Sequence, residues 1–233
     1  MAASVSRAPA RIPIAYVAVL VPVMAALNIV GGTINNALKL PVFLDMIGTM
    51  VASVALGPWW GALTGIITNT AGAFTISPTM IPFALCNVVG ALVWGYGIRN
   101  FGLGKSFGRL VVVSLLCGLF VQLMATPIVV FMFGGATGHS SDALLAAFAA
   151  AGNSLIASSF LSSISGSIAD KTIATFVGLA ILRALPAGLT AGIELPEGDM
   201  GKTLILAVVG LVLGILFTLI TFFVISPMLA PAA

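Results

Sequence analysis

A single carboxylate lies in the middle of a strongly apolar stretch of the chain. Residues 40–49 read LPVFLDMIGT, with Asp45 near the centre. Placing a charge near the centre of a bilayer costs ~2.5 to 3.5 kcal/mol, so a charged side chain in a membrane segment faces other helices or a watery cavity. Asp45 is therefore a candidate ligand-binding residue. The alternative is an internal ion pair with Lys39 or Lys171.

Other polar residues interrupt apolar segments in the same way. They are Asn69, Asn87 and the neighbouring pair Asp170 and Lys171. Amides and charges of this kind bind solutes when they meet in a cavity. The competing interpretation is structural: asparagines that bond a neighbouring helix, and an acidic residue and a lysine at a helix end.

The residues needed for catalysis are missing from the sequence. It has one histidine and neither a GxSxG nor an HExxH pattern. The segment PEGDMGKT ends like a phosphate-binding loop, but Pro196 occupies the position of the required first glycine. Cys86 and Cys117 both lie in apolar runs and are expected to act as small hydrophobic residues. We therefore expect no enzyme activity, no metal and no cofactor.

The composition is that of a membrane protein. The chain is 60% hydrophobic and 6% charged, whereas soluble domains carry about 25% charged residues. The net charge of +3 is too small and too scattered to suggest nucleic acid. Apolar runs predict an all-α integral membrane protein with spans near 12–30, 40–57, 59–75, 81–98, 108–133, 168–186 and 203–226. The segment 142–166 is helical in pattern but ambiguous as a span.

The distribution of basic residues predicts the orientation. If 142–166 stays on the outer side, seven of the nine basic residues are cytoplasmic; if it crosses, six are. The positive-inside rule favours the first arrangement, with a cytoplasmic N-terminus in a multi-pass cell-membrane protein, most simply the bacterial plasma membrane. A cleaved signal peptide is the alternative for the first run, but 11–31 is long enough to span.

This orientation places the polar residues at similar depths. With a helical rise of ~1.5 Å per residue, Asp45 lies roughly 8 Å below the outer end of its span. Asn69 and Asn87 come within two turns of outer ends, and Asp170 and Lys171 open the sixth span. The sequence therefore predicts a cavity open to the outside.

Small residues recur at helical spacing in three spans. Gly57, Gly61 and Gly65 recur every four residues, which predicts close helix packing. Ala18 and Ala26 flank Pro22 in the first span, and Gly210 and Gly214 lie in the last. The surfaces on the first and last spans could receive a partner helix or pack within the chain.

Several of these stretches resemble the substrate-binding (S) component of energy-coupling factor (ECF) transporters. They are NIVGGTINNALKLPVFLDMIGTMVASVALGPWWGALTGIITNT, ISPTMIPFALCNVVGALVWG, FGGATG and DKTIATFVGLAILRALP. The resemblance covers about residues 10–186 and implies a six-helix bundle that binds a vitamin or related micronutrient at its outer face. The span 203–226 would be an additional seventh helix.

The resemblance also implies partners and binding regions. The partners are a transmembrane coupling subunit, which docks on small residues of the first helix, and two cytoplasmic ATPases. Here the AxxxA pattern is replaced by Ala18, Pro22 and Ala26. The family's substrate-binding regions contain Asn35, Asn36, Lys39, Asn87, Gln122, His139, Asn153 and Asp170; the depth argument adds Asp45, Asn69 and Lys171.

The expected organisation is a binding domain over 1–186, a cytoplasmic linker over 187–202 and a transmembrane helix over 203–226. The expected function is solute capture for an ECF-type ABC importer. Two alternatives stay open: a ligand sensor or assembly protein with the same fold, and a self-sufficient secondary carrier. A secondary carrier would normally show inverted repeats, and none is visible.

Overall fold

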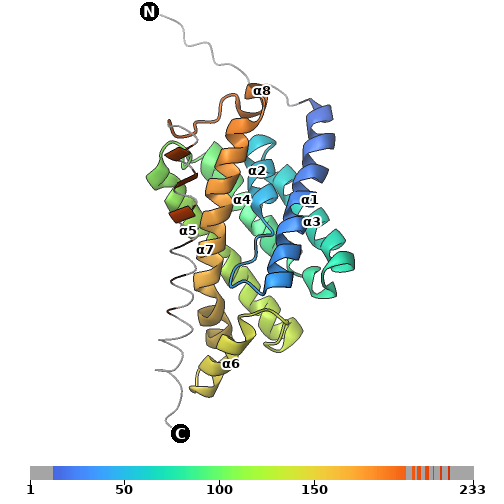
Figure 1. Cartoon of the computed structure of the whole chain (residues 1–233), viewed down its shortest axis with the longest axis vertical. Coiled ribbons are helices and arrows are strands. Elements are labelled where there is room, and N and C mark those ends of the chain that lie inside the picture. Colours follow the sequence, from blue (N-terminus) through green and yellow to red (C-terminus); the bar gives the residue numbers. More distant parts are fainter. Residues whose placement is uncertain are drawn as a thin grey trace, which may run out of the picture.

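The computed structural model describes residues 13–197 and nine separate positions between 201 and 220. This part of the chain is helical and contains no strand (Figure 1). Its eight α-helices are α1 (Ile14–Leu38), α2 (Ile47–Ala55), α3 (Pro58–Thr75), α4 (Ala84–Arg99), α5 (Phe107–Pro127), α6 (Asp142–Ala150), α7 (Leu155–Ala184) and α8 (Ala187–Thr190). A 3-10 turn, η1 (Pro78–Met80), precedes α4, and a π-helical turn, η2 (Ile128–Met132), extends α5.

Among the described residues, three helices are long and apolar enough to cross a membrane. They are α1, α5 together with η2, and α7. The chain is therefore a multi-pass membrane protein by helix length and composition. Of the three, α7 is the least hydrophobic and has the largest buried share.

The helices pack so that α7 lies against α5, α2 and α6, while α3 lies between α1 and α4. In Figure 1, α8 and the start of α1 lie at one end and α6 at the other. The apolar core includes Trp94, which is fully buried and donates from Nε1 to the Thr175 hydroxyl at 2.9 Å. This bond joins α4 to α7, and the polar residues discussed below lie nearer the α6 end.

The prediction of a helix over 40–57 is wrong in its first half. The chain leaves α1 at Lys39 in a left-handed conformation and runs without helical structure to Met46. Pro41 contributes, because proline has no N–H and disfavours helix at the preceding residue. Leu44 also has a positive φ of 58°. We call residues 40–46 the strap.

The predicted boundary of the sixth helix is also wrong. Segment 142–166 is not one helix: α6 ends at Ala150, a turn with Gly152 at φ 89° follows, and α7 begins at Leu155. The Ser154 hydroxyl caps α7 by accepting from the Ala157 N–H at 3.3 Å. Consequently Asp170 and Lys171 lie in the middle of a 30-residue helix and do not open it.

The predicted linker 187–202 contains α8 and is tied to the bundle. Arg183 donates to the Pro196 carbonyl at 2.7 Å, and Lys105 pairs with Glu194 at 2.8 Å. The predicted helix 203–226 lies largely outside the described residues, as do Gly210 and Gly214.

The glycine stripe of α3 packs within the chain. A Cβ on Gly61 would overlap Ser53 of α2, and one on Gly65 would lie 2.5 Å from Cβ of Asn87 on α4. The internal-packing prediction for this stripe is confirmed. Ala18, Pro22 and Ala26, in contrast, are exposed on α1.

Candidate functional site

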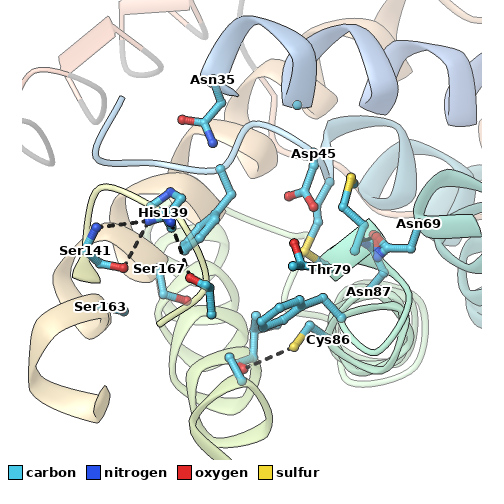
Figure 2. A pocket seen from close by; sticks show the side chains of 18 of the residues that line it. Asn35, Asp45, Asn69, Thr79, Cys86, Asn87, His139, Ser141, Ser163 and Ser167 are labelled. Carbon is cyan, nitrogen blue, oxygen red and sulfur yellow. Dashed lines mark hydrogen bonds between the residues drawn. The ribbon is translucent and has the colours of Figure 1, made fainter. Parts of the chain in front are cut away.

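A cavity of about 340 Å³ lies at the end of the bundle where α1 and α3 finish and α4 begins. The strap, η1, α5, α7 and the loop before α6 complete its wall (Figure 2). Eight of the eleven predicted binding residues line it: Asn35, Asn36, Asp45, Asn69, Asn87, Gln122, His139 and Lys171. That these residues bind a substrate stays a prediction, but the chain does bring them together.

The other three predicted residues do not line the cavity. Lys39 is exposed and donates to Oδ1 of Asn36 at 3.3 Å. Asn153 donates to the Phe148 carbonyl at 3.0 Å, so its amide closes the end of α6. Asp170 is buried behind the strap. These side chains satisfy backbone or rim groups because the strap and the α6–α7 break, which the sequence analysis missed, redirect them.

Four buried polar side chains form a hydrogen-bonded relay that ends in the cavity. Asn28 on α1 donates to the Thr49 hydroxyl at 2.9 Å, and Thr49 donates to Oδ1 of Asn87 at 2.7 Å. Asn87 then donates from Nδ2 to Oδ1 of Asn69 at 3.2 Å. The four side chains are between 0% and 1% exposed. They join α1, α2, α4 and α3 through one network.

A backbone N–H fixes the direction of this relay. The N–H of Gly48 points at Oδ1 of Asn28 at 2.6 Å, and a backbone N–H can only donate. Oδ1 of Asn28 must therefore be the acceptor, which sets the orientation of every later amide. At the far end, Nδ2 of Asn69 has no partner among the described residues. Asn69 thus offers an N–H donor to the cavity.

His139 offers a second unpartnered polar atom. The backbone N–H of Ser141 donates to Nδ1 of His139 at 3.2 Å, so in the neutral ring the proton resides on Nε2. Nε2 is buried without a partner. Burial lowers the pKa of His139 below its usual 6.5, although the nearby backbone of Val42 and the carboxylate of Asp142 oppose the shift. The imidazole is therefore neutral at pH 7 and its Nε2–H is a donor.

Aromatic rings form part of the cavity wall. The Phe43 ring of the strap stacks on His139, with centroids 4.6 Å apart and an interplanar angle of 21°. Nζ of Lys171 lies 5.5 Å from the Phe43 centroid. Phe83, which also lines the cavity, is parallel to Phe133 at 5.9 Å. Flat apolar surfaces of this kind suit a planar ligand.

Asp170 holds the strap in place. One oxygen, Oδ1, accepts from the backbone N–H groups of Phe43 at 3.1 Å and Leu44 at 2.6 Å. The other, Oδ2, pairs with Nζ of Lys171 at 2.5 Å, and both side chains are at most 2% exposed. The buried carboxylate and ammonium therefore compensate each other.

Asp45 is less constrained. Its carboxylate forms no ion pair within the described part of the chain, because Lys171 pairs with Asp170. Neither predicted ion pair, with Lys39 or with Lys171, is present. Figure 2 shows Asp45 directed into the space that Thr79 and Asn69 also face.

Sequence reasoning missed several lining residues, including Phe43, Thr79, Ser163 and Ser167, and the supporting residue Asn28. Asn28 gave the same signal as Asn69, an amide in an apolar span, and could have been found. The serines are common helix residues, and no pattern in the sequence separates those that face the cavity.

The described residues contain no group of three or more His, Cys, Asp or Glu that could hold a metal ion. Comparisons with known protein families, with curated proteins and with solved structures find no match for this chain.

Proposed function

We propose that this protein is a membrane-embedded solute-binding subunit that captures a small molecule at the outer face of the cell membrane. The observation that carries the proposal is the set of unpartnered buried atoms on cavity-lining residues: Oδ1 of Asn35, Nδ2 of Asn69 and Nε2 of His139. A buried polar atom without a partner costs about 1–3 kcal/mol. A ligand that satisfies all three would recover this free energy.

The fold supports capture over catalysis. The cavity volume of about 340 Å³ lies at the small end of ligand sites, about 300–1,000 Å³, and suits a compact molecule. The resemblance of residues 10–186 to ECF S components suggests that this molecule is a vitamin or related micronutrient. On this proposal α1–α7 correspond to the six-helix bundle, with α6 on the outer side, and 203–226 adds a seventh transmembrane helix.

The same resemblance suggests the partners. Ala18, Pro22 and Ala26 form an exposed line of small side chains on α1, a surface on which another helix can lie closely. We propose that an ECF coupling subunit docks there and that two cytoplasmic ATPases drive release.

Binding is tested on the full-length protein purified in detergent. Native mass spectrometry of protein from cells grown in rich medium is expected to show a non-covalent adduct of small mass, absent after partial unfolding and refolding. Asn69→Ala is expected to lose the adduct with only a moderate fall in melting temperature, because Nδ2 has no protein partner and the one bond lost is that from Asn87 to Oδ1. A control, Asn100→Ala on the exposed end of α4, retains it. If no small-molecule adduct is found on the parent protein, the proposal of solute capture is refuted.

A further inference from the structure

The charges around the cavity distinguish between classes of ligand. Among the described lining residues, Asp45 is the one carboxylate and Lys171 the one lysine. The ammonium of Lys171 is already neutralised by Asp170, which lies behind the strap and does not line the cavity. The carboxylate of Asp45 forms no ion pair with a described residue, and Lys171, which also attracts it, is already paired with Asp170. The cavity wall therefore carries one uncompensated negative charge.

Other cations do not offset that charge. Lys39 is exposed at the rim, and its Nζ contacts Oδ1 of Asn36. His139 is neutral at pH 7 because burial lowers its pKa. An anionic ligand would bring a second negative charge close to Asp45, and removing two like charges from water together is costly. A cationic ligand would provide the missing counter-charge.

The wall also indicates the shape and polarity of the ligand. The rings of Phe43 and Phe83 are part of the cavity lining, and aromatic rings attract both planar rings and cations. The relay leaves an N–H donor at Asn69, as described above, so the ligand should bring an acceptor to that side. The ligand's positive charge is therefore sought by Asp45, and its hydrogen-bond acceptor by Asn69.

We propose that the cavity selects a compact, singly charged organic cation built on a planar ring, with its positive end at Asp45 and an acceptor atom at Asn69. This inference rests on the proposed function and narrows it to one substrate class. Asp45 is then the residue that determines charge specificity, and the Asp170–Lys171 pair keeps Lys171 from cancelling it.

The first experiment uses three pyridine-ring probes of similar size: the cation of N-methylated nicotinamide, neutral nicotinamide and anionic nicotinate. Each is titrated against detergent-purified protein at pH 7.5 while the melting temperature is followed. The cation is expected to stabilise most and nicotinate least. Asp45→Asn is expected to lower the affinity for the cation by roughly tenfold or more, as for loss of a charge-assisted hydrogen bond. The three probes should then stabilise the variant to similar extents. Glu197→Gln removes an exposed carboxylate and should change nothing. Absence of a preference for the cation overturns the inference.

The second experiment separates this inference from the proposed function. Yeast extract is divided by ion exchange into cationic, neutral and anionic fractions, and each is tested on the parent protein and on Asp45→Asn. Stabilisation by the cationic fraction, lost in Asp45→Asn and kept in Glu197→Gln, supports the inference. Stabilisation by another fraction, or stabilisation that survives Asp45→Asn, refutes the charge class while leaving capture intact. No stabilisation by any fraction, together with no co-purified molecule, refutes both.

Discussion

Asp170 on α7 accepts a 2.6 Å hydrogen bond from the backbone N–H of Leu44, a residue 126 positions earlier in the chain. The same carboxylate oxygen accepts from Phe43, whose ring forms part of the cavity wall. Leu44 has a φ of 58°, a conformation that costs a residue with a β-carbon about 1–2 kcal/mol. The buried carboxylate therefore stabilises the strained strap, and the strap in turn positions the Phe43 ring in the cavity wall.

The Asp170–Lys171 pair gives a prediction about stability. Asp170→Ala should destabilise the protein by about 3–5 kcal/mol, because it leaves the ammonium of Lys171 buried without a counter-charge. The double variant Asp170→Ala with Lys171→Met should recover part of this loss, since no buried charge remains. Thermal unfolding in detergent measures both. Equal melting temperatures for the single and double variants would show that the ammonium is not effectively buried.

Close packing of the strap gives a second prediction. A Cβ on Gly166 would lie 2.6 Å from the carbonyl oxygen of Pro41. A Cβ on Gly31 would overlap the carbonyl oxygen of Leu44. Gly166→Ala should therefore push the strap away from α7 at a cost of about 1–3 kcal/mol and weaken ligand binding by displacing Phe43. Gly188→Ala is the matched control, because nothing lies within 4 Å of its Cβ position. Unchanged melting and binding in Gly166→Ala would contradict this packing.

The comparison of sequence and structure depends on what each residue contacts. Composition was sufficient to predict an all-helical membrane protein, because apolar length alone decides that class. Depth along expected helices grouped Asn69 and Asn87 correctly, since helical rise is regular, whereas Asp45 reaches the same cavity from the non-helical strap. It misplaced Asp170, because the strap and the α6–α7 break depend on contacts made across the fold. No local pattern encodes an extended segment held by a carboxylate 126 residues away.

The relay predicts unequal effects for its two ends. Asn28→Ala removes the acceptor for the Gly48 N–H and the donor to Thr49, and should cost about 1–3 kcal/mol because a buried donor is left unpaired. It should also weaken ligand binding, since the amides of Asn87 and Asn69 are then free to flip. Asn69→Ala should weaken binding at least as much with a smaller change in stability. The double variant Asn28→Ala with Asn69→Ala should bind the ligand no more weakly than Asn69→Ala alone, because both substitutions act through the amide of Asn69.

The docking surface on α1 gives a prediction that separates binding from transport. Ala18→Trp and Ala26→Trp put bulky groups on an exposed face away from the cavity, so ligand affinity and melting temperature should change little. Association with an ECF coupling subunit, measured by co-purification after co-expression, should be lost because a helix can no longer approach closely. Val19→Trp, on a neighbouring exposed position of the same helix, tests whether the line of small residues matters. Equal association of all three variants would argue against docking on these residues.

His139 gives a pH dependence with a defined sign. Burial lowers its pKa in the folded protein below the 6.5 expected in the unfolded chain. As the pH falls below about 6.5, the unfolded chain takes up a proton that the folded protein resists, so stability decreases with acidification. Protonation of Nδ1 would also break its hydrogen bond with the Ser141 N–H and disturb the stacking of His139 on Phe43. Melting temperature measured from about pH 7.5 to 5.5 should fall more steeply in the parent than in His139→Phe, which keeps an aromatic ring but cannot titrate. Asp142, which accepts from Thr137 and Gly138, is present in both proteins, so its contribution cancels in the difference. Parallel curves would show that proton uptake at His139 is not linked to folding.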